Sequence, residues 1–384
     1  MKSNILCLSL IIFFFASCDK KTSKQAGREG DGVIAVDIER DDKVSVFDYF
    51  SHIEVIPLET RKESVMNPRI EKFLVYKDHY YCFDKKQMLI FVFDLSGKYV
   101  KTINKQGNGP GEYKTLYDFS FNRFSGNLEL MDAWCRILVY DESGEDYKET
   151  IRLPDSETTT HYYTQLTPDI YIFINPFRVQ ENKMFFFSKS KNEIIYETYD
   201  NYPDYMGKTS FGFSKNPFYI VNDTVCFSQL YNGDVYAIDK ESMKLLPRYL
   251  FDFKEHNFTI ADIPRDETIE YYLQFRNYVS NKYATFFMPE NENPDYFFSR
   301  FYFKQKAKHI LIDKKKHEIK VFNTFTENIQ CFAEYIDKEA MYAVTTYDKL
   351  DFVVKPELLD VENARKLESV NEESNQVIVK FYFK

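Results

Sequence analysis

The chain has 384 residues, a formal net charge of -9 at pH 7, an aromatic content of 18% and only 12 glycines. The acidic balance and the dispersed lysines and arginines argue against a nucleic-acid-binding protein, which presents a basic face. A mean hydropathy of -0.45 with 28% charged residues indicates a soluble globular chain, and the many aromatic residues favour strands.

The N-terminus predicts the compartment. Lys2 gives a positive start, and Ile5–Phe15 is an apolar run too short to span a bilayer as a mature helix. The run ends in Phe-Ala-Ser-Cys, which resembles a bacterial lipobox with the lipid-bearing cysteine at Cys18. We therefore expect a lipoprotein signal peptide over residues 1–17 and a flexible tether over 18–32. This places the protein in the cell envelope, anchored to the outer membrane or on the periplasmic face. A plain secretory signal with a chance cysteine is the alternative.

A repeated phrase predicts the architecture. Phe91–Gly97 and Leu138–Gly144 share a β-rich run, an Asp and a Ser-Gly turn, with their aspartates 47 residues apart at Asp94 and Asp141. A period of this length with short strands inside each unit is typical of a propeller blade. We predict an all-β fold: a six-bladed β-propeller of four-stranded antiparallel blades over residues 33–384, with one or two short helical insertions.

The strands follow from short β-rich runs separated by polar turns. In chain order they are Val33–Ile38 and Glu54–Leu58 before the first blade; Ile70–Tyr76, His79–Asp84, Leu89–Asp94 and Tyr99–Ile103 in blade 1; Tyr117–Asn122, Asn127–Asp132, Arg136–Tyr140 and Tyr147–Leu153 in blade 2; Ile170–Asn175, Lys183–Ser188 and Glu193–Tyr199 in blade 3, with a fourth near Thr209; Phe218–Val221, Thr224–Gln229, Asp234–Ile238 and Leu245–Phe253 in blade 4; Tyr283–Met288, Tyr296–Phe303, Lys308–Asp313 and Glu318–Phe325 in blade 5; and Ile329–Ile336 and Met341–Thr346 in blade 6.

Two helices interrupt this pattern, at Arg265–Ser280 and at Pro356–Ser369, and each is expected to pack beside a blade. A partner-binding helix is the alternative. The last strand, Gln376–Phe383, would be the third of blade 6, and Glu54–Leu58 would be its outermost strand. Both ends of the propeller would then share one blade, which closes the ring and protects its edges.

A family resemblance rests on two motifs, Ile56–Thr60 (Ile-Pro-Leu-Glu-Thr) and Gly107–Tyr113 (Gly-Asn-Gly-Pro-Gly-Glu-Tyr). With the aromatic-Asp-x-x-Gly turns, these motifs resemble the six-bladed β-propeller lipoproteins abundant in Bacteroidetes, which are similar to NHL-repeat proteins. The resemblance covers roughly Ser45 to Lys384. It implies the propeller fold and the envelope location, and it implies little about activity.

The glycine-rich motif is the first candidate site. It is not a P-loop, because that loop opens a helix and here a strand follows. We expect a tight link from the outer strand of blade 1 to the inner strand of blade 2. The functional alternative is a rim loop that exposes Glu112 and Tyr113 at the central channel. The residues of this candidate rim loop are Gly107, Gly109, Pro110, Gly111, Glu112 and Tyr113.

The other motifs give weaker indications of function. Asp223-Thr224-Val225 matches the short O-glycosylation motif known from Bacteroidetes, with Thr224 as the acceptor. The sequence shows no CxxC, HExxH or Gly-x-Ser-x-Gly motif, so we expect no metal and no cofactor. Cys82 and Cys226 are 144 residues apart, or three blades, and we expect both to be free buried thiols on second strands.

Two functions remain open from the sequence. The first is a lipid-anchored binding or scaffold module that presents a face to a partner protein or a glycan, with the membrane as its other partner and no nucleic acid. The alternative is a channel-centred metal-dependent hydrolase or lyase of the propeller type. Asp118 and Asn122, on an inner strand of blade 2, are the residues that this alternative would use. Fold analogy alone cannot carry an activity.

Overall fold

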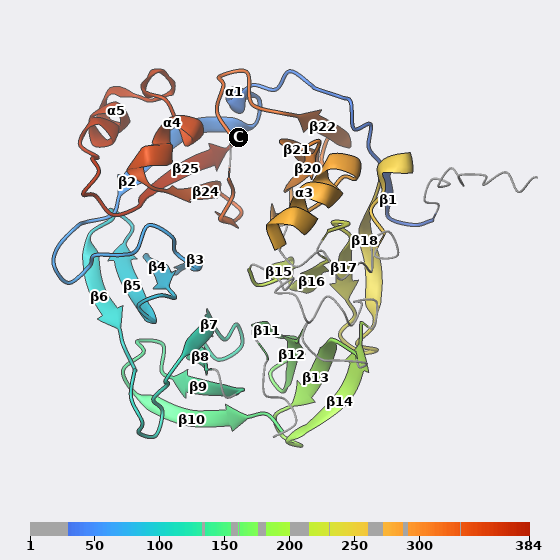
Figure 1. Cartoon of the computed structure of the whole chain (residues 1–384). Helices are drawn as coiled ribbons and strands as arrows, with labels where there is room; N and C mark the ends of the chain where they lie inside the picture. Colours follow the sequence, from blue (N-terminus) through green and yellow to red (C-terminus); the bar gives the residue numbers. More distant parts are fainter. Residues whose placement is uncertain are drawn as a thin grey trace, which may run out of the picture.

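The computed structural model describes residues 30–132, 135–154, 160, 162–175, 182–199, 215–229, 231–259, 272–286, 291–330 and 332–384. Six sheets stand around a common axis and form a ring (Figure 1). Five sheets have four strands and one has five, and every pairing but one is antiparallel. The predicted six-bladed β-propeller is thus confirmed.

Blades 1 and 2 follow the prediction closely. Their strands are β3 (Lys72–Tyr76), β4 (His79–Asp84), β5 (Leu89–Asp94) and β6 (Tyr99–Ile103), then β7 (Leu116–Phe121), β8 (Leu128–Asp132), β9 (Arg136–Tyr140) and β10 (Tyr147–Arg152). The repeated phrase forms the turn after the third strand of each blade. The Asp94 carboxylate accepts the amide of Ser96 at 2.8 Å, and Gly97 has φ +84°, a conformation that glycine adopts without strain.

Blade 3 differs from the prediction by one strand. Its strands are β11 (Tyr162–Gln165), β12 (Ile170–Ile174), β13 (Met184–Ser188) and β14 (Glu193–Thr198). The three predicted strands are therefore the second, third and fourth, and the inner strand β11 was missed. Its sequence, Tyr-Tyr-Thr-Gln, has no aliphatic residue and is only four residues long, so it carries little strand signal. The strand expected near Thr209 lies outside the described residues.

Blade 4 gains a fifth strand from the N-terminus. Its own strands are β15 (Phe218–Val221), β16 (Thr224–Ser228), β17 (Val235–Ile238) and β18 (Leu245–Asp252). β1 (Val33–Ala35) pairs in parallel with β18, with Val33 opposite Leu250. The chain then runs along blade 5, where Asp42 donates its amide to the carbonyl of Val321 at 2.8 Å. The N-terminal strand was predicted, but its position on blade 4 was not.

Blade 5 also differs at its inner strand. Its strands are β19 (Asn291–Glu292), β20 (Tyr296–Phe303), β21 (Lys306–Asp313) and β22 (Glu318–Phe322). The predicted inner strand Tyr283–Met288 is wrong. Within it, Thr285 and Phe286 form isolated bridges to Tyr302 and Tyr231, and Met288 lies outside the described residues.

Blade 6 closes the ring as predicted. Its order from the channel outward is β23 (Tyr335–Ile336), β24 (Ala340–Thr345), β25 (Val377–Phe383) and β2 (Phe50–Pro57). The C-terminal strand β25 is therefore third, and β2, which precedes blade 1 in the chain, is outermost. Val55 of β2 lies opposite Val379 of β25. The pairing leaves neither terminal strand as an open edge of an incomplete blade.

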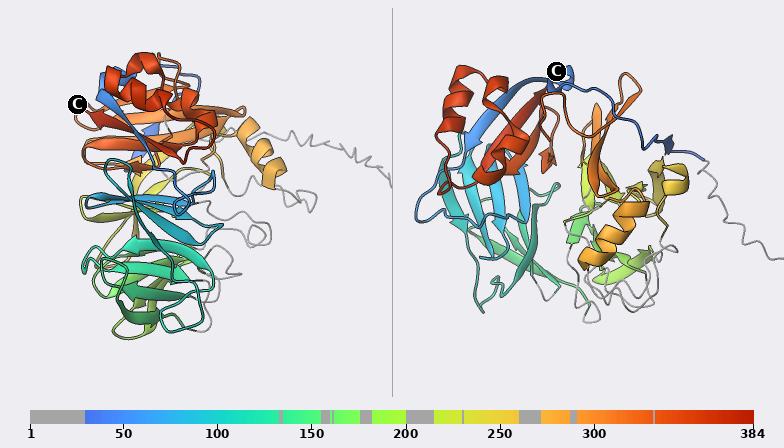
Figure 2. Two further views of the ribbon diagram at one scale, coloured as in Figure 1. Left: turned by 90° about the vertical axis from the view of Figure 1, so that its left-hand side faces the viewer. Right: turned by 45° about the horizontal axis from the view of Figure 1, so that its top comes forward.

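The helices lie outside the sheets. α3 (Tyr272–Lys282) covers the later part of the first predicted helix and projects from one face of the ring, as Figure 2 shows. The second predicted helix is a 3-10 turn, Pro356–Leu358, followed by α5 (Val361–Glu368). α5 packs beside blade 6, where Asn363 accepts the amide of Val55 at 2.9 Å. The short helices α1 (Val46–Tyr49) and α4 (Leu350–Val353) flank the same blade.

The core lies between neighbouring blades. One buried cluster, for example, joins Phe83 and Ile90 of blade 1 to Phe119 and Leu130 of blade 2. Burial of a large apolar side chain contributes about 1.5–3 kcal/mol, so these seams hold the blades at fixed angles. No helix within the described part of the chain has the length and apolar character needed to cross a membrane.

Candidate functional site

The inner strands of the six blades surround a central channel with a volume of about 460 Å³. Because the blades converge here, side chains that are about 45 residues apart in sequence become neighbours. Partly exposed aromatic residues alternate along the wall with charged ones. The lining includes Tyr76, Tyr117, Phe218, Tyr219, Phe332 and Tyr335 among the aromatics, and Glu71, Lys72, Asp118, Arg123, Lys215, Glu292, Arg300 and Glu334 among the charged residues.

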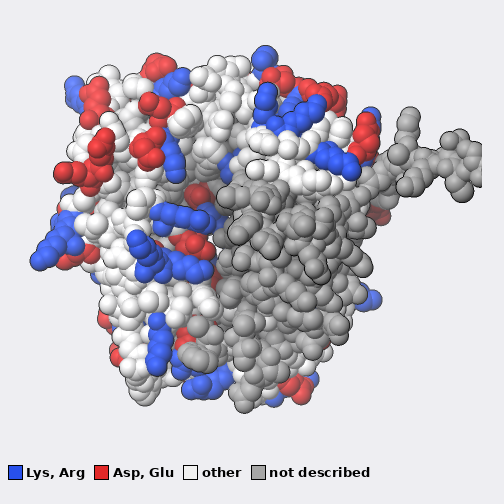
Figure 3. All heavy atoms as spheres, in the orientation of Figure 1, with Lys and Arg blue, Asp and Glu red and all other residues white. Residues whose placement is uncertain are grey.

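The channel has two ends that differ in chemistry. We call the end where the inner strands begin the first end, and the end where they finish the second end. α3 lies in the connection that leads into inner strand β19, so it lies at the first end. Over the described part of this face, Lys and Arg stand next to Asp and Glu, and neither sign forms a continuous field (Figure 3).

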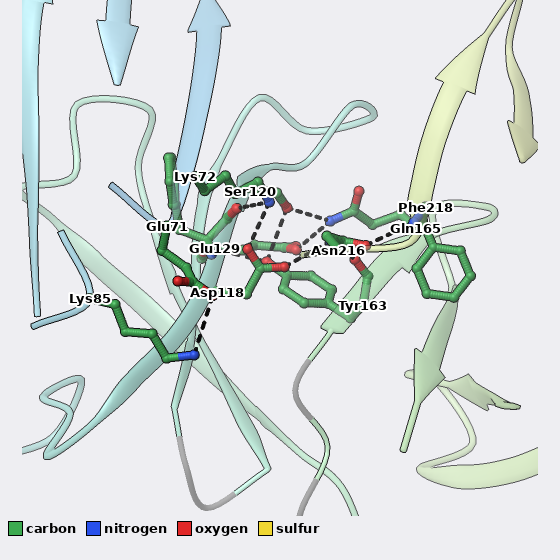
Figure 4. A network of polar contacts seen from close by, with 11 residues as sticks. Glu71, Lys72, Lys85, Asp118, Ser120, Glu129, Tyr163, Gln165, Asn216 and Phe218 are labelled. Atoms are coloured by element: carbon green, nitrogen blue, oxygen red, sulfur yellow. Dashed lines mark hydrogen bonds and ion pairs between the residues drawn. The ribbon is translucent and has the colours of Figure 1, made fainter. Parts of the chain in front are cut away.

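A polar network occupies the first end (Figure 4). Lys72, the first residue of β3, donates from Nζ to Oδ1 of Asp118 at 2.7 Å and to the carbonyl of Phe119 at 2.6 Å. Asn216 donates from Nδ2 to Oδ2 of Asp118 at 2.9 Å and to the carbonyl of Tyr163 at 3.1 Å. Burial raises the pKa of Asp118 above its ordinary value, although the Lys72 ammonium favours the ionised form.

Two consecutive residues carry contacts across the channel. Lys215 forms an ion pair with Glu334 of blade 6, and its neighbour Asn216 reaches blades 2 and 3. The segment that leads into β15 is therefore bonded to three other blades at once. We call Lys215 and Asn216 the latch. Its contacts cross the first end of the channel and link blades that do not adjoin.

A buried carboxylate supports the wall behind this network. Glu129 is 1% exposed and accepts hydrogen bonds from Asn122 Nδ2 at 2.7 Å, Tyr171 Oη at 2.7 Å and Gln165 Nε2 at 2.5 Å. Burial raises the pKa of Glu129 above its ordinary value. These bonds fix Gln165, whose side chain belongs to the channel lining.

Asp118 and Asn122, the two residues named for a metal-dependent reaction, are held apart by these bonds. Asp118 is paired with Lys72, and Asn122 is turned to Glu129. Within the described ranges, no group of three or more His, Cys, Asp or Glu side chains could hold a metal ion. The geometry therefore gives no specific support to the channel-centred metal reaction.

The second end of the channel is more apolar. Tyr76 and Phe121 stack with ring centroids 3.8 Å apart and planes within 3°, and Ile220 is 42% exposed. Arg123 spans three blades here, because it pairs with Asp223 at 2.7 Å and donates to the carbonyl of Leu166 at 2.8 Å. This end thus offers an aromatic and aliphatic surface with one anchored guanidinium.

A second buried carboxylate joins blades 4 and 5 beside the channel. Glu292 accepts hydrogen bonds from Arg248 at 2.6 Å, from Tyr249 at 2.7 Å and from Tyr219 at 2.9 Å, and it also pairs with Lys314. These partners lower the pKa of Glu292 even though its burial opposes ionisation. Two cations therefore converge on one carboxylate.

The candidate rim loop does not line the channel. Tyr113 is fully buried and donates from Oη to the carbonyl of Met88 at 2.6 Å, contrary to the exposure considered from the sequence. The Glu112 carboxylate folds back onto the amide of Gly109 at 2.6 Å, and a Cβ at Gly107 would collide with it. The loop is a tight connection between β6 and β7, as expected. A binding role for its exposed residues, such as Pro110, stays a prediction.

The remaining predicted residues fall in different places. Thr224 is half-buried at the start of β16, beside a turn in which Asn222 and Asp223 both have positive φ. Cys82 and Cys226 are buried and free, on β4 and β16, the second strands of blades 1 and 4. Cys18 lies outside the described residues. Glycosylation of Thr224 and lipidation of Cys18 both remain predictions.

Sequence reasoning missed most of the channel residues. Lys72, Lys215, Asn216 and Glu334 lie within three residues of the start of an inner strand, and each is an ordinary polar residue at a strand boundary. Position relative to the start of each inner strand is the signal that would have found them. For blade 5 that signal fails, because its inner strand was assigned to the wrong segment.

Comparison with solved structures supports the fold. A Bacteroides fragilis protein described as a "Putative exported protein" superposes with a TM-score of 0.74 at 16% identity, covering 92% of this chain and 99% of that one. A member of the duf4221 family from Bacteroides vulgatus gives a TM-score of 0.52 at 10% identity, covering 87% and 97%. At these identities the likeness concerns the fold alone. Among curated proteins, none matches the chain.

The family is shown by the sequence over almost the whole ring. The profile described as "Domain of unknown function (DUF4934)" matches residues 32–382, from just before β1 to the penultimate residue of β25. The match thus includes all six blades and the N-terminal strand that pairs with blade 4. The chain therefore belongs to the DUF4934 family.

Proposed function

We propose that this protein is a lipid-anchored binding module of the cell envelope, which takes the end of a glycan or a short segment of a partner protein into its central channel. The observation that carries the proposal is the channel itself, with about 460 Å³ lined by residues of all six blades. Ligand sites are typically concavities of about 300–1,000 Å³ with convergent polar groups on an apolar wall. The mixture of aromatic and charged side chains fits this description.

The size of the channel limits what enters it. A volume of about 460 Å³ accommodates a few sugar rings or amino-acid side chains, not a folded domain. The contacts of the latch cross the first end, and the second end is lined by Tyr76, Phe121 and Ile220. The ligand therefore enters from the second end, with its terminal group directed toward the polar network.

The cell-envelope location is supported from two sides. The sequence of residues 1–18 resembles a lipoprotein signal, and the polar tether 18–32 leads directly to β1. The structural neighbour from Bacteroides fragilis is described as a "Putative exported protein". The resemblance to the Bacteroidetes propeller lipoproteins agrees with both. The partners we propose are the membrane, through the lipid on Cys18, and a glycan or protein in the channel, with no nucleic acid.

The proposal is tested by blocking the channel. Ile220→Trp enlarges an exposed side chain at the second end, whereas Leu246→Trp makes the same kind of change at an exposed position of the outer strand β18. The purified chain from Asp19 is screened against arrayed envelope glycans and peptides, and hits are titrated by calorimetry. We expect Ile220→Trp to weaken binding at least tenfold and Leu246→Trp to leave it unchanged. Equal affinities for the two variants would place the ligand outside the channel.

A further inference from the structure

An amine, a carboxyl group and an amide from three different blades meet at the first end of the channel (Figure 4). They belong to Lys72 at the start of β3 in blade 1, to Asp118 on β7 in blade 2, and to Asn216 just before β15 in blade 4. Lys72 Nζ donates to Oδ1 of Asp118 at 2.7 Å, and Asn216 Nδ2 donates to Oδ2 of the same side chain at 2.9 Å. One carboxylate thus holds a primary amine on one oxygen and a primary amide on the other.

These three groups have the chemistry of an amide exchange. A neutral lysine amine is a nucleophile, and the side-chain carbonyl carbon of asparagine is an acyl group whose leaving group is ammonia. A carboxyl group in contact with both nitrogen atoms can take a proton from the amine and give one to the leaving nitrogen. The cluster therefore contains a nucleophile, an acyl carbon and a proton-transfer group.

The surroundings of Asp118 suit proton transfer. The residue is 2% exposed, and its Oδ1 also accepts the backbone amide of Phe119 at 2.9 Å, which fixes the carboxyl group. Burial raises the pKa of Asp118 and so stabilises the protonated form that such a reaction passes through. Transfer of a proton from Lys72 to Asp118 removes both charges from this buried place and with them their desolvation cost.

Asn216 holds its amide group in a fixed orientation. Besides its bond to Asp118, Nδ2 donates to the carbonyl of Tyr163 at 3.1 Å. Its Oδ1 accepts the backbone amide of Phe218 at 3.0 Å. A donor in this position stabilises the negative charge that develops on Oδ1 when the amide carbon is attacked. The leaving nitrogen therefore faces a proton source, and the carbonyl oxygen faces a hydrogen-bond donor.

The movement that the reaction requires is a turn of Lys72 toward Asn216. Nζ also donates to the carbonyl of Phe119 at 2.6 Å, and this bond breaks when the amine turns. Attack brings the amine nitrogen to about 3–3.5 Å from the amide carbon. The flexible four-carbon stem of lysine allows such a turn without a change in the backbone, and the shared carboxylate keeps both partners at the site while it occurs.

We propose that Lys72 and Asn216 form an intramolecular isopeptide bond, with Asp118 as the proton-transfer group. Asp118 takes a proton from the Lys72 ammonium, and the free amine attacks Cγ of Asn216. Asp118 then gives that proton to Nδ2 and takes a second one from Nζ, while the Cγ–Nδ2 bond breaks and ammonia leaves. The products are an Nζ–Cγ amide, a protonated Asp118 and one ammonia, so nothing is oxidised or reduced. The inference does not depend on the ligand proposed for the channel.

The bond ties together parts of the ring that share no seam. It joins the inner edges of blades 1 and 4 across the first end of the channel. A covalent crosslink between distant residues restricts the unfolded chain and so stabilises the folded one. Among the described residues the cysteines Cys82, Cys135 and Cys226 are free, so in this part of the chain the amide takes the place that a disulfide has in other proteins.

The test is the mass of the folded protein. The chain from Asp19 is purified, incubated until its mass is constant, then denatured and measured by intact-mass spectrometry. We expect each chain to be lighter than its sequence by one ammonia molecule. A peptide map should show the segment that contains Lys72 joined to the segment that contains Asn216, with no tryptic cleavage after Lys72.

Variants assign the roles of the three residues. Lys72→Arg keeps the charge but removes the nucleophilic amine, and Asn216→Ala removes the acyl carbon, so both should have the full mass of their sequences. Asp118→Ala should form the bond at least tenfold more slowly. Lys77→Arg changes an exposed lysine just after β3 and is the matched control, which should lose ammonia as the wild type does.

Other outcomes decide against the inference. A wild-type protein of full mass, or a loss of ammonia that persists in Lys72→Arg, shows that the bond does not form. A loss that maps to Asn108 and Gly109 identifies a succinimide instead of a crosslink. An unchanged rate in Asp118→Ala shows that Asp118 does not transfer the proton. Cooperative thermal melting of each variant excludes misfolding as the cause of a full mass.

Discussion

At the scale of single residues, His309 is the least satisfied group in the described structure. It is fully buried on β21, and its ring stacks on Phe298 at 5.5 Å and contacts Phe322 at 5.2 Å. Neither ring nitrogen has a hydrogen-bond partner among the described residues. Burial, with a smaller contribution from Arg300, lowers the pKa of His309 to about 3. The folded protein therefore holds this imidazole neutral.

This burial predicts a pH-dependent stability. Since the folded pKa lies below the unfolded value of about 6.5, the unfolded chain binds a proton first as the pH falls. The contribution of His309 to the free energy of unfolding is fully present above about pH 6.5 and declines toward pH 3. At pH 5 it is smaller by roughly 2 kcal/mol. His309→Phe should remove that part of the decline, and His52→Phe, at an exposed position, should not. Urea unfolding at pH 7.5 and pH 5 measures both, and parallel declines in all three proteins would contradict the argument.

The cysteines give a second prediction at this scale. Cys82 and Cys226 lie on second strands three blades apart, and burial raises the pKa of both thiols, that of Cys226 to about 11. Both should stay reduced and react slowly while the protein is folded. Denaturation with alkylation and no reductant, followed by peptide mapping, should find both thiols labelled. A crosslinked Cys82–Cys226 peptide would be incompatible with the blade register.

At the scale of elements, the pairing of β2 with β25 completes the ring. Truncation before Gln376 removes β25 and leaves β2 and β24 without their shared neighbour. We expect a large fall in melting temperature, or insolubility, because both flanking strands lose their backbone hydrogen bonds. Deletion of residues 19–29, just upstream of the described residues, is the control and should change the melting temperature little. Similar melting of the two truncations would mean that β25 does not complete the ring.

The elements also show what the sequence could predict. Blades 1, 2 and 4 were recognisable because long β-rich runs stand between clear turns, and the position of Glu54–Leu58 ahead of blade 1 revealed the closure. The inner strands β11 and β19 were missed, because they have four and two residues and are largely polar. β1 was recognised as a strand, but its parallel partner β18 is more than 200 residues away, and no local pattern encodes that contact.

The candidate site was less predictable than the fold. Lys72, Asn216 and Arg300 become parts of one channel wall only when the six blades assemble, and none of them belongs to a sequence motif. The glycine-rich motif drew attention because it is unusual in composition. Its rarity reflects a tight connection, in which Gly111 has φ +79° and its carbonyl accepts Tyr140 Oη at 2.5 Å. The unusual composition of the glycine-rich motif reflects a constraint on the backbone of the connection. The channel, in contrast, is lined by common residue types, which only the assembled fold brings together.

At the scale of the whole molecule, the lipid anchor is the prediction most open to test. Cys18→Ala should release the mature chain from membranes into the soluble fraction, because the variant lacks the thiol that would carry the lipid. Fractionation of cells expressing each form, with a carbonate wash, measures the distribution. A Cys18→Ala protein that still sediments with washed membranes would show that something other than the lipid retains it.

The wrapping of residues 33–57 around blades 4, 5 and 6 also sets an order of events during biosynthesis. Val33 pairs with Leu250 and Val55 pairs with Val379, so neither strand can pair until a much later part of the chain has been synthesised. Blades 1 to 3 use only neighbouring hairpins and can form while the chain is still emerging, but the ring cannot close until the last strand has been synthesised. The N-terminal strands therefore remain unpaired for nearly the whole of synthesis. Ring closure is then a late step that follows synthesis of the last strand, and until it occurs the exposed edges need protection from aggregation.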